Sequence, residues 1–166
     1  FWIELPTASP QVPDRPEPQH PERVADRPAP ATSTTKTVLY VEDNPSNVNL
    51  VERLVGRRPG IDLMVATQGA TGLPLALEHR PDLILLDVMM PGMNGWQFRV
   101  EQRKRPALTD IPVIALSADV SPYAAAIDAN AYLKKPVDFD RLCLVIEQII
   151  LASERKQLAA RAVELE

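Results

Sequence analysis

Residues 83–95, LILLDVMMPGMNG, join an apolar run directly to a carboxylate. Leu83 to Leu86 has the composition of a buried strand, and Asp87 follows it without a spacer. The pair Pro91-Gly92 then marks a turn. A charged side chain at the end of a core strand needs an explanation, because carboxylates are seldom buried without a partner. The role of Asp87 depends on which other groups the fold brings to the same place.

From residue 36 onward the chain alternates between strand and helix patterns. Runs rich in β-branched and apolar residues predict strands at 36–41, 61–66, 83–86, 112–116 and 131–133. Helical spacing predicts helices at 45–55, 69–79 and 96–105, and a long last helix that is capped by Asp138 and continues at least to Leu151. This alternation predicts an α/β fold, a doubly wound parallel sheet of five strands covered on both faces.

Two prolines bear on the expected helices. Asn44 followed by Pro45 is typical of a helix start, with a side-chain cap and then a proline at the first helical position. Pro74 lies beyond the first turn of the second helix, where a lost hydrogen bond and a ring clash cost about 3 kcal/mol. We therefore expect the second helix to start late or to kink.

The composition is that of one small globular domain with spare length. A net charge of -4 gives no electrostatic basis for binding nucleic acid or an anionic membrane. No apolar stretch reaches the ~20 residues that span a bilayer, and the opening at Phe1 lacks the basic flank of a signal peptide. The single cysteine, Cys143, lies in an apolar helical pattern and is expected to be a buried thiol in a reducing compartment. We expect a cytoplasmic piece of a longer protein.

The first part of the chain differs in composition from the rest. Prolines recur from Pro6 to Pro30 among charged and polar residues, which excludes a helix or a central strand. The segment also has too few apolar groups to offset its ordering entropy. We therefore predict that residues 7–35 form an extended, semi-stiff linker. A proline-rich ligand for the aromatic groove of a partner is the alternative.

Polar groups follow four of the five expected strands. Glu42 and Asp43 follow the first strand, Asp87 the third, Ser117 the fourth and Lys135 the fifth. The carboxyl ends of parallel strands share one edge of a doubly wound sheet, so these groups are expected to gather there. Taken singly, each has a simple structural role: Asp43 as a helix cap, Ser117 in a turn or Lys135 as a solvated cation.

The combination points to chemistry. Three crowded carboxylates repel one another unless a cation joins them. An all-oxygen set suits Mg²⁺, which prefers one or two carboxylates together with phosphate oxygens. A lysine and a hydroxyl beside such a cation can bind the oxygens of a phosphoryl group carried on a carboxylate.

Residues 36–151 resemble the receiver domain of response regulators, the phosphoacceptor module of two-component signalling. Four stretches carry the resemblance in chain order: VLYVEDNPSN at 38–47, DLILLDVMMPGMNG at 82–95, IPVIALSA at 111–118 and AYLKKP at 131–136. The resemblance implies a flavodoxin-like fold with strand order 2-1-3-4-5.

The resemblance implies a role for each group at the sheet edge. Glu42 and Asp43 form the acidic pair that holds Mg²⁺. Asp87 is the nucleophile that takes a phosphoryl group from the phosphohistidine of a histidine kinase. Ser117 turns its hydroxyl toward the phosphoryl group, and Lys135 is the paired cation.

Four neighbouring positions receive roles in the same way. The backbone carbonyl of Met89 completes the metal shell, to which Asp87 also contributes. Ala118 is a small residue beside the acceptor, and Tyr132 occupies the aromatic switch position. Pro136 follows Lys135 through a cis peptide bond that aims the ammonium at the phosphoryl site.

Several residues depart from the family pattern. Arg99 and Gln102 lie where the family has apolar residues, so we expect the helix that carries them to pack loosely. Between Ser117 and Lys135 the chain is about one helical turn shorter than is usual. The fourth helix is therefore expected to be short, at Tyr123–Ile127.

The order of segments suggests a domain layout. The opening FWIELP, residues 1–6, resembles the last strand of the ATP-binding domain of histidine kinases. A kinase-domain end, the linker 7–35 and a receiver at 36–151 would make a hybrid histidine kinase, with this chain itself not an enzyme. A histidine phosphotransfer domain is a further expected partner. Residues 152–166 either extend the last helix or begin another linker.

Two other functions fit part of the pattern. A metal-dependent phosphatase with an aspartyl nucleophile has a second Asp two residues later, and Met89 occupies that place here. A receiver-like interaction module that is never phosphorylated usually lacks the acceptor or an acidic partner, and this chain has both.

Overall fold

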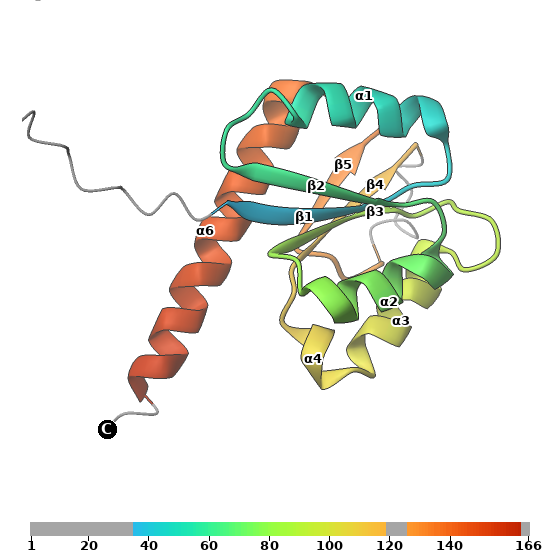
Figure 1. The fold of residues 1–166 in the computed structure, drawn as a ribbon. Helices are drawn as coiled ribbons and strands as arrows, with labels where there is room; N and C mark the ends of the chain where they lie inside the picture. The colour runs from blue at the N-terminus through green and yellow to red at the C-terminus, as the bar shows by residue number, and fades with distance from the viewer. Residues whose placement is uncertain (1–34, 119–125, 164–166) are drawn as a thin grey trace, which may run out of the picture. The chain divides into compact units, whose positions relative to one another are not determined.

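The computed structural model describes residues 35–118 and 126–163, and the sheet it contains has five parallel strands. The strand order is β2-β1-β3-β4-β5, which confirms the predicted doubly wound, flavodoxin-like sheet (Figure 1). The strands are β1 (Lys36–Val41), β2 (Ile61–Ala66), β3 (Leu83–Asp87), β4 (Val113–Ser117) and β5 (Ala131–Lys134).

Helices cover both faces of this sheet. Helices α1 and α6 lie on one face, and α2, α3 and α4 on the other (Figure 1). Their bounds are α1 (Pro45–Val55), α2 (Gly69–His79), α3 (Gly95–Arg103), α4 (Pro106–Thr109) and α6 (Phe139–Val163). The short helix expected at Tyr123–Ile127 falls largely on residues 119–125, outside the described part of the chain.

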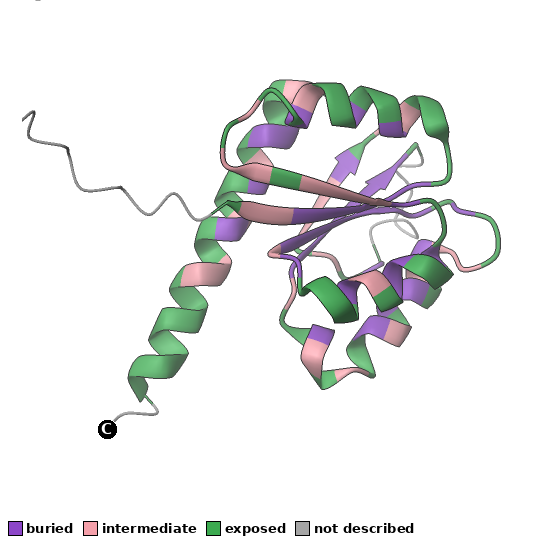
Figure 2. Ribbon diagram, viewed as in Figure 1, coloured by how far each residue is buried: buried purple, intermediate pink, exposed green. Residues whose placement is uncertain are grey.

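The core has two layers because successive strand residues point to opposite faces. On β1, Leu39 and Val41 pack with the α2 and α3 side, whereas Val38 and Tyr40 pack with the α1 and α6 side. Every residue of β3 and β4 is buried, as expected for central strands of a parallel sheet (Figure 2). The two central strands therefore hold their last residues, Asp87 and Ser117, at fixed positions.

Side-chain caps set the helix starts as predicted. Oδ1 of Asn44 accepts a hydrogen bond from the Ser46 N–H at 2.9 Å, with Pro45 in the first turn. Oδ1 of Asp138 accepts from the Arg141 N–H at 2.9 Å. α2, in contrast, does not start late: it begins at Gly69 and runs through Pro74, whose ring is exposed.

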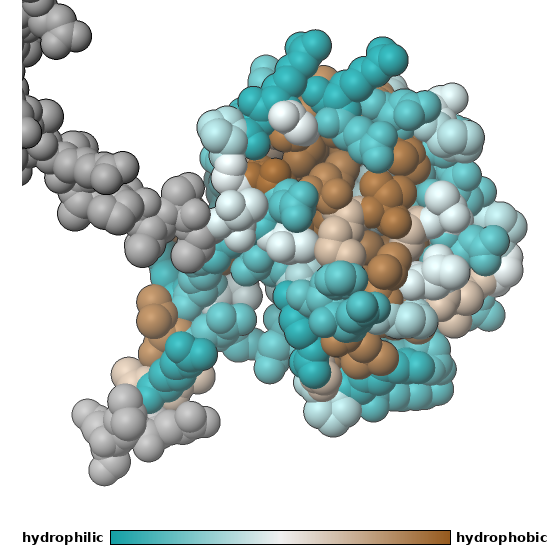
Figure 3. Space-filling model, in the orientation of Figure 1, coloured by the Kyte–Doolittle hydropathy of each residue, from teal (hydrophilic) through white to brown (hydrophobic). Residues whose placement is uncertain are grey.

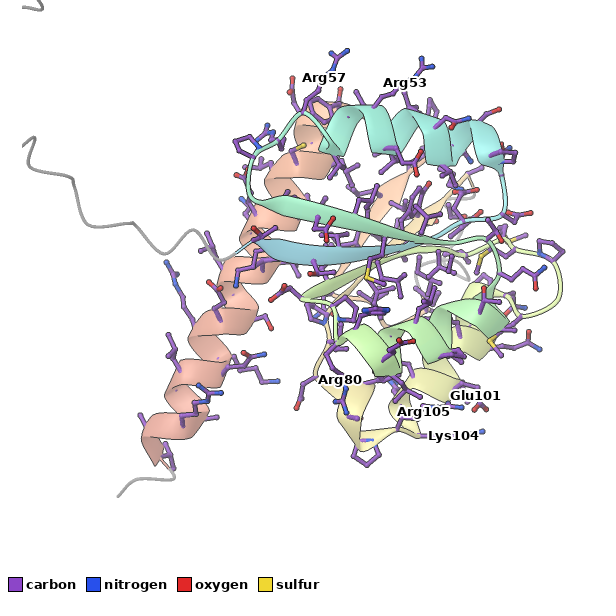
Figure 4. All side chains as sticks on the ribbon, viewed as in Figure 1. Arg53, Arg57, Arg80, Glu101, Lys104 and Arg105 are labelled. Atoms are coloured by element: carbon purple, nitrogen blue, oxygen red, sulfur yellow. The ribbon has the colours of Figure 1, made fainter. Side chains whose placement is uncertain are left out.

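The end of the third helix differs from the expected one. α3 ends at Arg103 rather than at residue 105, and the separate turn α4 begins at Pro106, where a proline is tolerated. Charged side chains gather here (Figure 4), with Glu101 bonded to Lys104 at 2.7 Å and to Arg105 at 3.0 Å. Arg80, at the end of α2, donates to the Ala107 carbonyl at 2.7 Å. These surface bonds tie α2, α3 and α4 together.

The expectation that α3 packs loosely is wrong, because its two unusual polar residues are buried and bonded. Nε2 of Gln102 donates to the carbonyls of Leu108 at 2.9 Å and Ile111 at 3.0 Å, and the side chain is fully buried. Arg99 donates to Oε1 of Gln102 at 2.7 Å and to the Asp128 carbonyl at 2.7 Å. Burial lowers the pKa of Arg99 to about 10, and the nearby charge of Arg103 adds to this effect.

The last helix continues well past the sheet. α6 runs without a break to Val163, and its buried residues all lie at or before Ile150. Glu154, one turn later, still forms an ion pair with Lys36 at the start of β1. Within the part of the chain that the structure describes, no helix is apolar over a length sufficient to cross a membrane.

Candidate functional site

The polar groups singled out in the sequence lie at the edge of the sheet toward which the strand arrows point (Figure 1). Asp87 pairs with Leu116 in the register of β3 and β4, and Ser117 pairs with Lys134 in that of β4 and β5. The ladder continues into the loops, since the Lys135 N–H donates to the Ser117 carbonyl at 2.8 Å. The strand register and this bond therefore place Asp87, Ser117 and Lys135 at the ends of neighbouring strands.

Three carboxylates meet at this edge. Glu42, Asp43 and Asp87 each offer one oxygen, and these oxygens lie within 4.8 Å of one another. Glu42 is fully buried and Asp87 is 5% exposed, whereas Asp43 is exposed. The cluster thus opens to solvent on the Asp43 side.

Lys135 supplies the positive charge of the cluster. Its Nζ lies 2.5 Å from Oε2 of Glu42 and 2.9 Å from Oδ2 of Asp87. The Lys135–Pro136 peptide bond is cis. One ammonium therefore bridges the two buried carboxylates.

Glu42 has further donors that sequence reasoning missed. The Tyr40 hydroxyl donates to its Oε2 at 2.8 Å, the Asn47 side-chain amide to its Oε1 at 3.0 Å, and the Asn44 N–H to the same Oε1 at 3.2 Å. Two features of the sequence could have indicated these hydrogen bonds. Tyr40 precedes Glu42 by two strand positions and so shares its face, and Asn47 lies in the first turn of the helix that follows.

The surroundings shift the pKa values of the two buried carboxyl groups in opposite directions. Burial alone raises the pKa of Glu42, but the bonds from Lys135, Asn47 and Tyr40 hold it below its ordinary value. Burial raises the pKa of Asp87 above its ordinary value, because the bonds from Lys135 and the Met89 N–H only partly offset it. The charge of Glu42 adds to the rise. Glu42 is therefore the fixed anion of the pair, and Asp87 holds its charge less firmly.

The loop that follows Asp87, residues 88–94, is shaped by one hydrogen bond and one glycine. The Met89 N–H donates to Oδ1 of Asp87 at 3.0 Å, which orients the carboxylate. At Gly95, a Cβ would lie 2.8 Å from the Val88 Cα and 3.0 Å from the Ile127 side chain. Only a glycine lets α3 begin this close to the backbone of Asp87 and Val88. The metal role of the Met89 carbonyl stays a prediction.

The remaining predicted residues lie on or next to the two strands that follow β3 in the sheet, β4 and β5. Ser117 is fully buried at the end of β4, and Ala118 next to it is exposed. Tyr132, on β5, is half-buried and packs against the apolar layer on the α2 and α3 side of the sheet. The switch roles of these residues stay predictions.

The donor set fits a hard divalent cation. The clustered carboxylate oxygens come from one exposed and two nearly buried residues, and one side is open to water. Mg²⁺ typically binds through one or two carboxylates and retains several waters. Glu42, Asp43 and Asp87 are thus the residues that would hold it.

Comparison with known proteins identifies relatives of one kind. The sequence model of one protein family, the response regulator receiver domain, matches residues 38–147. The polar-differentiation response regulator DivK of Brucella ovis is 32% identical over 124 residues, covering 70% of this chain and 97% of DivK. Protein PilH of Pseudomonas aeruginosa is 29% identical over 117 residues, covering 68% of this chain and 96% of PilH.

A longer relative is matched only in part. The chain is 30% identical over 132 residues to RpaA of Synechocystis, a DNA-binding dual master transcriptional regulator. This match covers 77% of the chain and 54% of RpaA, so the chain spans about half of that protein.

Solved structures with the same fold include two close in size to the described domain. The receiver domain of sensor histidine kinase PA1611 from Pseudomonas aeruginosa, with a magnesium ion in its active-site cleft, is 28% identical with a TM-score of 0.65. That match covers 69% of this chain and 97% of the other. The chemotaxis protein CheY4 of Vibrio cholerae is 27% identical with a TM-score of 0.64, covering 69% and 98%.

Proposed function

This chain belongs to the response regulator receiver domain family of two-component signalling, and on that premise we propose that Asp87 accepts a phosphoryl group from a phosphohistidine. The observation that carries the proposal is the placement of Asp87 between Lys135, at 2.9 Å, and two further carboxylates. A purely structural aspartate at a strand end needs neither neighbour.

The chemistry is a transfer between two side chains. A carboxylate oxygen of Asp87 attacks phosphorus, the phosphorus–nitrogen bond breaks, and its electron pair returns to the imidazole of the donor. The product is an acyl phosphate on Asp87, and no net proton change is required at the aspartate. Lys135 faces the Oδ2 side of Asp87, where it can balance charge that moves onto the phosphoryl oxygens.

The acidic pair provides the counter-charge. Bound Mg²⁺ supplies charge neutralisation and orientation for phosphoryl oxygens. Glu42, fixed by Tyr40, Asn47 and Lys135, would anchor one side of the ion, and the exposed Asp43 the other. The buried hydroxyl of Ser117 and the small side chain of Ala118 lie at the end of β4, beside the acceptor strand.

The expected partners carry histidine. As a receiver domain, the chain acts with a histidine kinase or a histidine phosphotransfer domain, and we propose that its parent is a hybrid histidine kinase. The similarity to the PA1611 receiver, which is part of a sensor histidine kinase, supports this origin. So does the opening FWIELP, which resembles the end of a kinase ATP-binding domain. The chain alone is proposed to be a phosphoacceptor and not an enzyme.

A small phosphodonor tests the proposal directly. Incubated with acetyl phosphate and Mg²⁺, the chain should gain one phosphoryl group by intact mass, and hydroxylamine should remove it. Asp87→Asn should gain none, while Asp62→Asn, at an exposed position on β2, should behave as the parent. Failure of the parent to gain the group from acetyl phosphate and from a phosphorylated kinase domain would favour a phosphorylation-independent interaction module.

A further inference from the structure

The start of α2 lies against the loop 88–94, and a glycine makes this contact. Gly69 is the first residue of α2 and is buried. A Cβ at this position would lie 2.7 Å from the carbonyl oxygen of Met93 and 3.1 Å from two carbons of the Met93 side chain. Side-chain carbons do not approach a backbone oxygen this closely, so a larger residue at position 69 must displace either α2 or the loop.

The core holds α2 in place along its inner face. Gly72, one turn later, lies so close to the sheet that a Cβ there would be 3.0 Å from Val41 and 3.2 Å from Phe98. Leu73 and Ala76, which follow on α2, are buried. Apolar side chains also gather between α1 and α2 on the side of the domain that β2 forms (Figure 3). A larger residue at position 69 therefore moves the loop rather than the helix.

Hydrogen bonds fix the two ends of this loop. The Gly95 N–H donates to the Val88 carbonyl at 3.0 Å, which closes the loop on itself. Asn94 forms a capping box with Gln97 at the start of α3. Between these fixed ends, the contact of Met93 with the start of α2 sets where the middle of the loop lies.

We propose that Gly69 is a positioning residue for the metal site, acting through the loop that carries Met89. The inference rests on the proposed function, in which Asp87 and the Met89 carbonyl help to hold Mg²⁺. The Met89 N–H donates to Oδ1 of Asp87 at 3.0 Å, so a shift of the loop moves a predicted metal ligand and turns the acceptor carboxylate at the same time. Gly69 itself touches neither the ion nor the phosphoryl group.

The consequence is a preference for one cation over another. Mg²⁺ demands a nearly ideal octahedral set of oxygens at about 2.0–2.1 Å, whereas Ca²⁺ accepts oxygens at about 2.3–2.6 Å in a flexible arrangement. A loop that Gly69 holds in one position meets the stricter demand of Mg²⁺. A displaced loop costs more affinity for Mg²⁺ than for Ca²⁺, so Gly69 favours Mg²⁺ in the competition between the two ions.

Isothermal titration calorimetry of the full 166-residue chain with Mg²⁺ and with Ca²⁺ tests the proposal. For Gly69→Ala we expect the dissociation constant for Mg²⁺ to rise at least about fivefold and that for Ca²⁺ less than about twofold. Gly56→Ala is the matched control, because its Cβ also meets a backbone carbonyl, that of Glu52 at 2.8 Å, but at the end of α1 that lies away from the carboxylates. It should bind both cations as the parent does. A loss of stability alone would leave the ratio of the two constants unchanged.

Met93→Gly is the second variant. It loosens the same contact from the side of the loop without adding an atom, so it decides the question if circular dichroism shows that Gly69→Ala does not fold. Its affinity for Mg²⁺ should also fall by a larger factor than its affinity for Ca²⁺. An unchanged ratio in Gly69→Ala, or in Met93→Gly if only that variant folds, overturns the positioning role and leaves the metal site standing. A parent chain that binds no Mg²⁺ overturns the metal site itself, and this inference with it.

Discussion

The hydroxyl of Tyr40 donates a 2.8 Å hydrogen bond to the carboxylate of Glu42, and both side chains are buried. The acidic pair is thus held from the inside of the domain, by a residue that never meets solvent. Burial is also the main reason why the pKa of Tyr40 is raised, with the charge of Glu42 next, so the phenol stays a donor at any physiological pH.

Removal of this donor should cost stability in a pH-dependent way. Tyr40→Phe loses a hydrogen bond to a charged group, which we expect to lower the free energy of unfolding by about 1.5–3 kcal/mol at pH 7. The folded pKa of Glu42 lies below its ordinary value of 4.5, so its ionised form stabilises the protein above that pH. As the pH falls through the folded pKa, the stability gap between variant and parent should close. Urea unfolding from pH 7 down to pH 2.5 measures it, and a gap that stays constant over the whole range would mean that the lost stability does not come from the bond to ionised Glu42.

Replacement of the acceptor should stabilise the metal-free protein. Because the folded pKa of Asp87 is raised, its ionised form costs stability, and the parent gains stability as the pH falls through that pKa. Asp87→Asn removes the cost, so at pH 7 in EDTA it should be more stable than the parent. The difference should shrink toward pH 4. Added Mg²⁺ should raise the melting temperature of the parent more than that of the variant.

Neutralising the exposed carboxylate should weaken metal binding while leaving the fold intact. Asp43→Asn removes one charge from the cluster, and we expect an affinity for Mg²⁺ at least about tenfold lower. Tryptophan fluorescence in a Trp2→Phe background follows the titration through Trp96, which lies at the start of α3, directly after the loop 88–94. Asp62→Asn in the same background should titrate as the parent does. Equal affinities for parent and Asp43→Asn would remove Asp43 from the metal site.

The buried amide of α3 should be costly to remove alone. Gln102→Leu leaves the Leu108 and Ile111 carbonyls and one guanidinium nitrogen of Arg99 without their partner, so we expect a loss of more than about 2 kcal/mol. Arg99→Leu should also destabilise. The double variant should lose less stability than the two single variants added together, because each single change leaves a buried polar group of the other residue without its partner. Strict additivity in urea unfolding would show that the two side chains do not act as a unit.

Phosphorylation should change this domain only locally. Arg99 donates to the Asp128 carbonyl, and Arg103 pairs with the Asp128 carboxylate, so α3 holds the chain just before β5. We therefore expect the domain to act mainly as a phosphoryl station. Amide shifts on addition of beryllofluoride, a phosphoryl mimic, should be large at Asp87 and small across 126–135. Comparable shifts in both regions would instead indicate a conformational switch.

The sequence predicted the elements better than their contacts. The runs at 36–41 and 61–66 match β1 and β2 residue for residue, because β-branched and apolar periodicity marks strands directly. The gathering of Asp87 and Lys135 followed from the rule that parallel strands end at one edge. The hydrogen bonds from Tyr40 and Asn47 to Glu42 were not predicted. A tyrosine in a strand pattern is interpreted as a core residue, and only the structure shows which group its hydroxyl bonds to.

The error on α3 has the same origin. Arg99 and Gln102 break an apolar pattern, and the pattern alone predicts exposure or poor packing. The pattern does not show that these two side chains hydrogen-bond to each other, or that Gln102 also donates to the Leu108 carbonyl before β4. Polarity is visible in a sequence, whereas the pairing of buried donors and acceptors depends on three-dimensional distances.

The Arg99–Gln102 pair also has a bearing on how this domain can have diverged. If only one of the two residues is replaced by an apolar one, buried polar groups of the other lose their partner. A protein with one polar and one apolar residue at these positions is therefore less stable than one with two polar or two apolar residues. A lineage could leave this arrangement only by a nearly simultaneous double exchange or from a surplus of stability. We therefore expect the two positions to covary among close relatives, as two polar or two apolar residues and seldom as one of each.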